Sequence, residues 1–440
     1  MLSPPHTARA NQPSVKVAVR VRPILPGLDD DLGETCIETE KDIGQELKVT
    51  TDVPLGLPHQ TATHHFQFDT VFGPQANQFI VYEDIGKPLV DAVMNGHRAC
   101  LFCYGQTGSG KTFSLLGEEG GRAVLDGMVP KMCEELFCRT ASMGTATSVL
   151  CSYYEIYDDK VYDLLRDPRE EPTPLPVRST GEGFEVVGQI SEQVQSAQEL
   201  MELVQAATEL RTISSNNVHE HSSRSHAFLS LTVQKDDKER KERLKMKELL
   251  EESKKKKDGA ATSDGEAASS GNPTPEPKRS SLMSDAPTWM SARLLLVDLA
   301  GSETYDAKEP HVQINVGLLA LGKVLNGLAN RRSHVPYRDS SLTKLLQAWL
   351  GGTARTSMLA CINPASANSY DSLCTLRYAR DAKVVVRSKG HEGMSPAGEE
   401  ADAKGAQGRP LTARSAGEEL DSFDTDLTLN RRVEFIESTR

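Results

Sequence analysis

The feature that most constrains the fold of this chain is a glycine-rich octapeptide, residues 105–112, which reads Gly-Gln-Thr-Gly-Ser-Gly-Lys-Thr. It fits the pattern G-x-x-x-x-G-K-[ST], in which glycines let the backbone N–H groups turn towards phosphate oxygens. The lysine would neutralise the outer phosphates, and the final threonine would offer its hydroxyl to Mg²⁺. The expected phosphate contacts are Gly105, Gln106, Thr107, Gly108, Ser109, Gly110, Lys111 and Thr112.

The segments around this loop fit the same interpretation. Residues 99–104 form an apolar run typical of a buried strand, and residues 113–116 are suited to open a helix whose N-terminus would favour an anion. An ATP- or GTP-binding protein is therefore the starting hypothesis. Elsewhere, strand and helix patterns alternate, which predicts an α/β fold with a central, mostly parallel sheet and helices on both faces. The expected strands are 15–23, 66–72, 147–156, 160–165, 227–233, 292–298 and 356–362, and the expected helices are 77–94, 129–140, 197–212, 314–329, 340–350 and 371–386.

Composition narrows the classes of partner. The 440-residue chain has a net charge of −12, which argues against a general nucleic-acid binder. It contains no apolar run long enough to span a membrane. Eight cysteines without a signal peptide indicate a reducing compartment. Cys100 and Cys103 form a C-x-x-C pair, but no second pair with zinc spacing follows, so a structural role is favoured over a metal site.

Three segments lie outside the regular pattern. Residues 1–13 and 388–440 have the composition of disordered ends, which leaves one domain over residues 14–387. Residues 235–290 are first dense in Lys, Arg and Glu and then rich in Ala, Ser, Gly and Pro. Because core patterning resumes at residue 292, this stretch is predicted to be an insertion within the domain. Its lysines suggest a tether to an acidic partner, although a solubilising loop is the favoured interpretation.

Two further segments carry residues that a phosphate loop needs. Asp298 ends a hydrophobic strand, where an acid would hold Mg²⁺ or its water, and Gly301 offers an unobstructed backbone N–H. Ser222 and Ser223 supply hydroxyls able to reach metal or phosphate. The adjacent Arg224 is a bidentate partner for a carboxylate such as Glu303, and a pair made only with a third phosphate present would act as a latch.

Six ordered segments make the chain resemble the kinesin motor domain over roughly residues 14–387, apart from the insertion. The resemblance implies an ATPase that uses ATP and Mg²⁺ and couples hydrolysis to microtubule binding through its switch segments, 222–226 and 298–303. The six segments are 20–23, 105–112, 222–226, 298–303, 318–322 and 334–340.

The resemblance also assigns roles to residues. It implies that adenine is flanked by Arg20, Arg22, Pro23 and Phe113. It implies a catalytic set of Ser222, Ser223, Arg224, Gly301 and Glu303, with Mg²⁺ held at Thr112, Ser223 and Asp298.

The same resemblance implies a microtubule-binding surface made by the helix 314–329, the loop 330–334 and residues 336–346. Basic side chains on that surface would face acidic tubulin, which gives a cytoplasmic location on the microtubule cytoskeleton. These side chains are Arg331, Arg332, His334, Arg338 and Lys344.

Several positions depart from the family pattern. His219 stands where kinesins have Asn in the first switch, and an imidazole titrates near neutral pH. The connection 304–313 is several residues shorter than the family's and carries few basic residues. Ser341 replaces a family lysine, and Asp381 replaces the arginine before the neck linker. No heptad pattern follows, so no coiled-coil stalk is visible.

Two other hypotheses stand as alternatives to the microtubule motor, and the departures favour the first of them. The first is a kinesin-like protein that binds nucleotide and microtubules but hydrolyses ATP weakly or without coupling. The second is a phosphate-loop kinase or GTPase unrelated to microtubules, which is disfavoured because no guanine-specifying Asn-Lys-x-Asp occurs.

Overall fold

One large sheet organises the part of the chain that the computed structural model describes, namely residues 15–27, 29, 31–52, 61–117, 126–143, 147–181, 183–213, 224–235, 291–303, 315–350 and 352–385. Within these ranges the sheet has eleven strands in the order β10-β6-β11-β12-β5-β13-β1-β4-β3-β2, with β7 paired to β6. Its strands are β1 (Val15–Val21), β2 (Ile37–Thr39), β3 (Ile43–Asp52), β4 (Thr61–Phe72), β5 (Ala99–Tyr104), β6 (Thr147–Tyr157), β7 (Lys160–Asp163), β10 (Glu192–Val194), β11 (His226–Lys235), β12 (Ser291–Asp298) and β13 (Arg355–Ile362).

The centre of this sheet is parallel and its flanks are antiparallel. Strands β12, β5, β13, β1 and β4 run in the same direction, whereas β11, β6 and β10 on one side and β3 and β2 on the other alternate. In the parallel register, Cys103 near the end of β5 lies opposite both Asp298 and Leu359. The segments that follow β5 and β12 therefore leave the sheet at the same edge.

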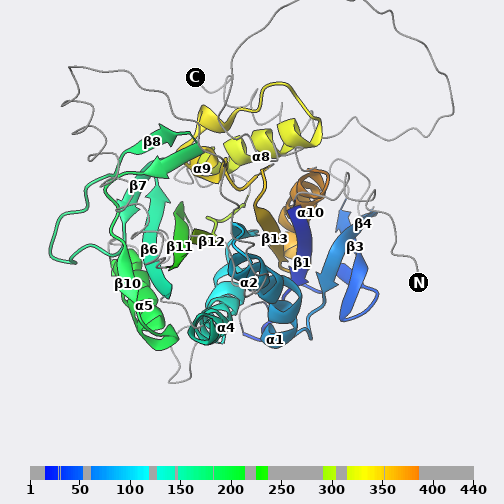
Figure 1. Ribbon diagram of the computed structural model, residues 1–440. Helices are drawn as coiled ribbons and strands as arrows, with labels where there is room; N and C mark the ends of the chain where they lie inside the picture. The colour runs from blue at the N-terminus through cyan, green and yellow to red at the C-terminus, as the bar shows by residue number, and fades with distance from the viewer. Residues whose placement is uncertain are drawn as a thin grey trace, which may run out of the picture. The chain divides into compact units, whose positions relative to one another are not determined.

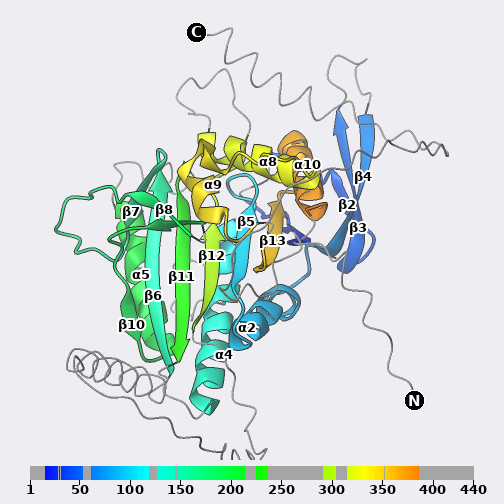
Figure 2. The same ribbon diagram turned by 45° about the horizontal axis from the view of Figure 1, so that its top comes forward.

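Helices cover both faces of the sheet, and each face has its own hydrophobic core (Figures 1 and 2). On one face lie α8 (Val316–Ala329), α9 (Ser341–Leu346) and α10 (Ser369–Lys383), coloured yellow to orange. On the other lie α1 (Gln78–Val81), the π-helix η1 (Tyr82–Gly86), α2 (Lys87–Met94), α3 (Lys111–Leu115), α4 (Met128–Ser142) and α5 (Ala197–Ile213). The predicted fold class is thus confirmed. Cys100 packs in the first core and Cys103 in the second, so the two thiols point to opposite faces.

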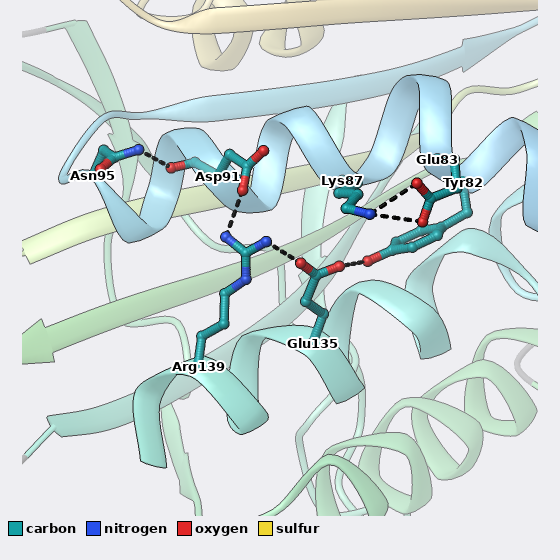
Figure 3. A network of polar contacts seen from close by, with 7 residues as sticks. All are labelled: Tyr82, Glu83, Lys87, Asp91, Asn95, Glu135 and Arg139. Atoms are coloured by element: carbon teal, nitrogen blue, oxygen red, sulfur yellow. Dashed lines mark hydrogen bonds and ion pairs between the residues drawn. The ribbon is translucent and has the colours of Figure 1, made fainter. Parts of the chain in front are cut away.

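The single helix expected over 77–94 is interrupted by the π-helix η1. Pro88 lies at the start of α2 and has no N–H to donate, so the regular ladder is broken there. A Cβ on Gly86 would lie 2.8 Å from the ring of Tyr82, which leaves glycine as the residue that fits. Polar side chains then tie this segment to α4. Tyr82 donates to Glu135, and Arg139 bridges Glu135 to Asp91 (Figure 3).

Helix α9 is shorter than the predicted helix 340–350. It begins with a capping box, in which Ser340 and Thr343 exchange side-chain and backbone hydrogen bonds. At its other end the Trp349 N–H bonds to the Leu346 carbonyl three residues back, so the chain tightens into turns. The small strands β2 and β10 and the separate hairpin β8 (Val177–Thr180) and β9 (Gly183–Val186) were not expected from the sequence.

Strands β11 and β12 form an antiparallel hairpin that brackets residues 236–290, which lie outside the described ranges. Gln234 pairs with Ser291, and Ala227 pairs with Asp298 at the other end. The register thus holds the described residues on either side of that segment next to each other. Among the described helices, none combines the length and apolar character needed to cross a bilayer.

Candidate nucleotide-binding site

A cavity of about 390 Å³ lies where the loop after β5 meets the ends of β1 and β12. The loop between β5 and α3 lines one part of it, and Arg22, Pro23 and Leu25 of the segment after β1 line another. All the predicted phosphate contacts from Thr107 to Thr112 line it, as do all four predicted adenine contacts. The lining residues are Arg20, Val21, Arg22, Pro23, Leu25, Pro74, Ala76, Thr107, Gly108, Ser109, Gly110, Lys111, Thr112, Phe113, Ser114, Asp298, Leu299 and Gly301.

Two glycines shape the loop. Gly105 has φ of 151°, and a Cβ there would collide with the carbonyl oxygen of Cys361 on β13. Gly110 has φ of 93°, the left-handed conformation from which α3 begins. Lys111 is buried, and its Nζ donates to the carbonyl oxygens of Gly105 and Gln106, each at 2.9 Å. The loop's own carbonyls thus hold the ammonium group in place beside the cavity.

The side of the cavity next to β12 has the oxygen atoms that Mg²⁺ prefers. Thr112 Oγ1 donates to Asp298 Oδ2 at 2.6 Å. The other carboxylate oxygen, Asp298 Oδ1, is buried without a hydrogen-bond partner in the described part of the chain. An orphaned carboxylate oxygen beside a hydroxyl suits a hard cation or its bound water. The residues present therefore fit a magnesium ion.

The segment after β12 lies directly against the phosphate loop. Ser302 N–H donates to the Gly105 carbonyl at 3.1 Å. The Glu303 carboxylate accepts from Thr107 N–H at 2.9 Å and from Thr107 Oγ1 at 2.6 Å. A Cβ on Gly301 would collide with that carboxylate and with the Thr107 hydroxyl. The predicted phosphate sensor, Gly301, is thus brought next to the loop.

Both arginines expected near adenine have protein partners. Arg20 donates to Gln78 Oε1 at 2.7 Å and to Ser114 Oγ at 2.8 Å, and its guanidinium lies over the Phe113 ring at 5.3 Å. Arg22 makes a bidentate pair with Asp29, at 2.5 and 2.6 Å. The hydrogen bonds from Arg22 lower the pKa of the Asp29 carboxyl to about 2. Both guanidinium groups are thereby fixed as walls of the cavity.

The first switch segment lies only partly within the described residues. Ser222, Ser223 and His219 are outside them, as are the connection 304–313 and both predicted ends. Arg224 is half-buried just before β11. How Arg224 lies relative to Glu303 in a nucleotide-bound state stays a prediction.

Arg211, at the end of α5, is a site residue that no sequence pattern singles out. Its Nε donates to Ser225 Oγ at 3.0 Å, and the guanidinium lies 3.6 Å from Glu155 and 3.9 Å from Asp298. It therefore joins β6, the first switch segment and the carboxylate that is expected to hold Mg²⁺. A lone arginine in the last turn of a helix is ordinary, so only the fold reveals this role.

His226 joins the two switch segments to α8. Its Nδ1 accepts a hydrogen bond from Ala300 N–H at 3.0 Å, and its Nε2 lies 3.1 Å from Asn315 Oδ1. Asn315 in turn caps α8 by accepting from Leu318 N–H. Burial lowers the pKa of His226 to about 4, so the ring is neutral at physiological pH.

The five basic residues predicted to face tubulin all follow α8 in the chain, and none of them lines the cavity. Arg331, Arg332, His334 and Arg338 are exposed, and Lys344 on α9 is half-buried. Val316, at the start of α8, is 58 % exposed.

The glycine loop, the paired hydroxyl and carboxylate, and the parallel strands behind them define a P-loop nucleotide-binding fold. A family model of the kinesin motor domain matches residues 20–385. The chain belongs to the kinesin motor-domain family. It is 31 % identical to a kinesin heavy chain of Botryotinia fuckeliana over 410 residues, and 32 % identical to kinesin-like protein KIF27 of Homo sapiens over 407 residues. These alignments cover 91 % and 88 % of this chain.

A solved structure of a fast kinesin aligns with a TM-score of 0.67 at 28 % identity, and the alignment covers 86 % of this chain and 93 % of that one. The two relatives are much longer, since the matched region makes up 40 % and 25 % of their lengths. The predicted family is thus confirmed by sequence and by structure.

Proposed function

We propose that this chain is an ATP-driven microtubule motor domain. The observation that carries the proposal is the Thr112–Asp298 hydrogen bond in the cavity lining, with the second Asp298 oxygen left for a cation. Mg²⁺ bound there would neutralise charge on the outer phosphates during transfer to water. Membership of the kinesin family and the basic surface after α8 support the microtubule as the track.

The proposal assigns separate tasks in hydrolysis to residues of the phosphate loop and of the two switch segments. Lys111 exchanges its bonds to loop carbonyls for the outer phosphates of ATP. Ser223 would hold the cation together with Thr112, and the Gly301 N–H would bond to the third phosphate. Ser222, Arg224 and Glu303 order the attacking water, because an arginine–carboxylate pair fixes geometry in two directions.

In this proposal, the N-terminal cap of α8 couples the nucleotide site to the microtubule. His226 contacts the backbone of the second switch at Ala300 and the cap of α8 at Asn315. A shift of the switch on phosphate binding therefore reaches the helix expected to lie on tubulin. The exposed basic residues from Arg331 to Arg338 favour an acidic partner there. The proposal includes a cytoplasmic location on the microtubule cytoskeleton, which the family membership supports.

The alternative is a kinesin-like protein that binds nucleotide and microtubules with weak or uncoupled hydrolysis. His219 and the short connection 304–313 motivate it. Steady-state ATP turnover with and without microtubules, beside co-sedimentation and a Lys111→Ala control, separates the two. Stimulation by microtubules supports the motor. Tight co-sedimentation without stimulation supports the alternative, and absence of both would overturn the microtubule assignment.

A further inference from the structure

The contact between Glu303 and Thr107 occupies two hydrogen-bond donors of the phosphate loop. Each carboxylate oxygen accepts one bond, Oε2 from the Thr107 N–H at 2.9 Å and Oε1 from the Thr107 hydroxyl at 2.6 Å. Charge-assisted bonds of this kind are the stronger ones, although both residues are exposed to solvent here. The contact is therefore specific in geometry and weak enough to be exchanged.

Thr107 lies in the lining of the cavity that is expected to hold the outermost phosphate. Thr107 and Gly301 line the same cavity as Lys111 and Asp298. A carboxylate and a phosphate are both anionic oxygen acceptors, so a donor pair that holds one suits the other. A Cβ on Gly301 would collide with the Glu303 oxygens and the Thr107 hydroxyl, so the carboxylate lies directly against the expected phosphate sensor.

Other polar groups of the phosphate loop are also occupied by protein hydrogen bonds. Lys111 is held by the carbonyls of Gly105 and Gln106, and Ser302 N–H holds the Gly105 carbonyl. The phosphate loop and the second switch thus satisfy each other's polar groups. An incoming third phosphate has to exchange these contacts, whereas a nucleotide with two phosphates leaves the Thr107 donors with Glu303.

We propose that Thr107 is a specificity-determining residue that distinguishes nucleoside triphosphate from diphosphate, by exchanging the Glu303 carboxylate for the third phosphate. The exchange releases Glu303 for its role beside Arg224. No covalent bond changes in this step. The inference rests on the proposed nucleotide-binding function. It adds which residue distinguishes a nucleoside triphosphate from a diphosphate.

The test is a double-mutant cycle on nucleotide affinity, which avoids reliance on turnover. Dissociation constants for ADP and for a non-hydrolysable ATP analogue, each with Mg²⁺, are measured by calorimetry for wild type, Thr107→Val, Glu303→Gln and the double variant. Glu303→Gln alone should shift the ratio of the two constants towards the triphosphate by about three- to tenfold, the range expected for hydrogen bonds that ATP need no longer displace. In the Thr107→Val background, Glu303→Gln should shift the ratio of the two dissociation constants much less.

The double-mutant comparison separates the contact from long-range charge. If Glu303 merely repelled the third phosphate, its substitution would have the same effect with either residue at position 107, and such additivity would overturn the proposal. Thr107→Ser keeps the hydroxyl and should restore the wild-type response to Glu303→Gln, whereas a purely structural role for the threonine methyl would not be rescued. A wild-type chain that binds neither nucleotide would refute the proposed function, and this inference with it. Tight binding with additive effects would overturn only this inference.

Discussion

His226 Nε2 lies 3.1 Å from Asn315 Oδ1, within the described core of the domain. Because Nδ1 of the same ring accepts the Ala300 N–H, the proton must be on Nε2, which therefore donates to Asn315. The ring is buried, and protonating Nδ1 would break its bond to the second switch. A neutral imidazole is thus part of the link between the cavity and α8.

Lowering the pH should destabilise the domain through His226. Its folded pKa of about 4 lies below the ordinary value of 6.5, so between these values the unfolded chain binds a proton that the folded chain does not. Stability then falls as pH drops from 6.5 towards 4, by up to about 1.4 kcal/mol per pH unit, and is unaffected by this group above 6.5. Nearby Arg211 and Lys111 act in the same direction. Urea unfolding across this range measures the slope, and His226→Asn should flatten it. An equal slope in the variant would contradict the assignment.

Lys111→Ala should abolish nucleotide binding and turnover. The substitution removes the one charge that the loop carbonyls hold beside the cavity, and loss of such a group costs on the order of 100-fold or more. Lys131→Ala is a matched control, because Lys131 pairs with Asp126 away from the cavity lining. Calorimetry with ADP and an ATP assay give the readouts. Near-normal binding by the Lys111 variant would argue against the phosphate-loop assignment.

Gly301→Ala should impair the response to the third phosphate more than the binding of ADP. The new methyl group would press on the Glu303 carboxylate and the Thr107 hydroxyl, so the second switch is displaced from the loop. Affinity for a triphosphate analogue should fall roughly tenfold or more, since a crowded donor loses its bond. Gly44→Ala is the control, because nothing lies within 4 Å of a Cβ there. Equal losses for both nucleotides would show that Gly301 does not sense phosphate number.

Removing the two adjacent positive charges of Arg331 and Arg332 should weaken microtubule binding without changing basal ATP turnover. Both side chains are exposed and lie outside the cavity lining. Charges at an interface rim act mainly through steering, so the double alanine variant should lose roughly three- to tenfold in affinity and show a flatter salt dependence. Co-sedimentation across a salt series measures this. Lys41→Ala with Lys48→Ala makes the same charge change on the β2–β3 side, and an equal loss there would refute a local surface.

The local parts of the site could be predicted from the sequence, and the long-range parts could not. The strand, glycine loop and helix around Lys111 are contiguous, and Asp298 is marked by the apolar strand that it ends. Arg211 and the His226–Asn315 link depend on how α5, β11 and α8 come together, which no short pattern encodes. Edge strands such as β2 and β10 are three residues long, too short for a period to show. The π-helix η1 was hidden because residues 77–94 keep helical spacing on either side of it.

The pairing of Gln234 with Ser291 makes the β11–β12 hairpin a natural attachment point for foreign sequence. Because closure entropy grows only with the logarithm of loop length, doubling the bracketed segment costs about 0.6 kcal/mol. Seven residue steps along β12, roughly 23 Å, separate Ser291 from Asp298. A fluorescent protein exchanged for residues 236–290 would thus have two adjacent anchors and little influence on the nucleotide, which makes this position suitable for a single-molecule reporter.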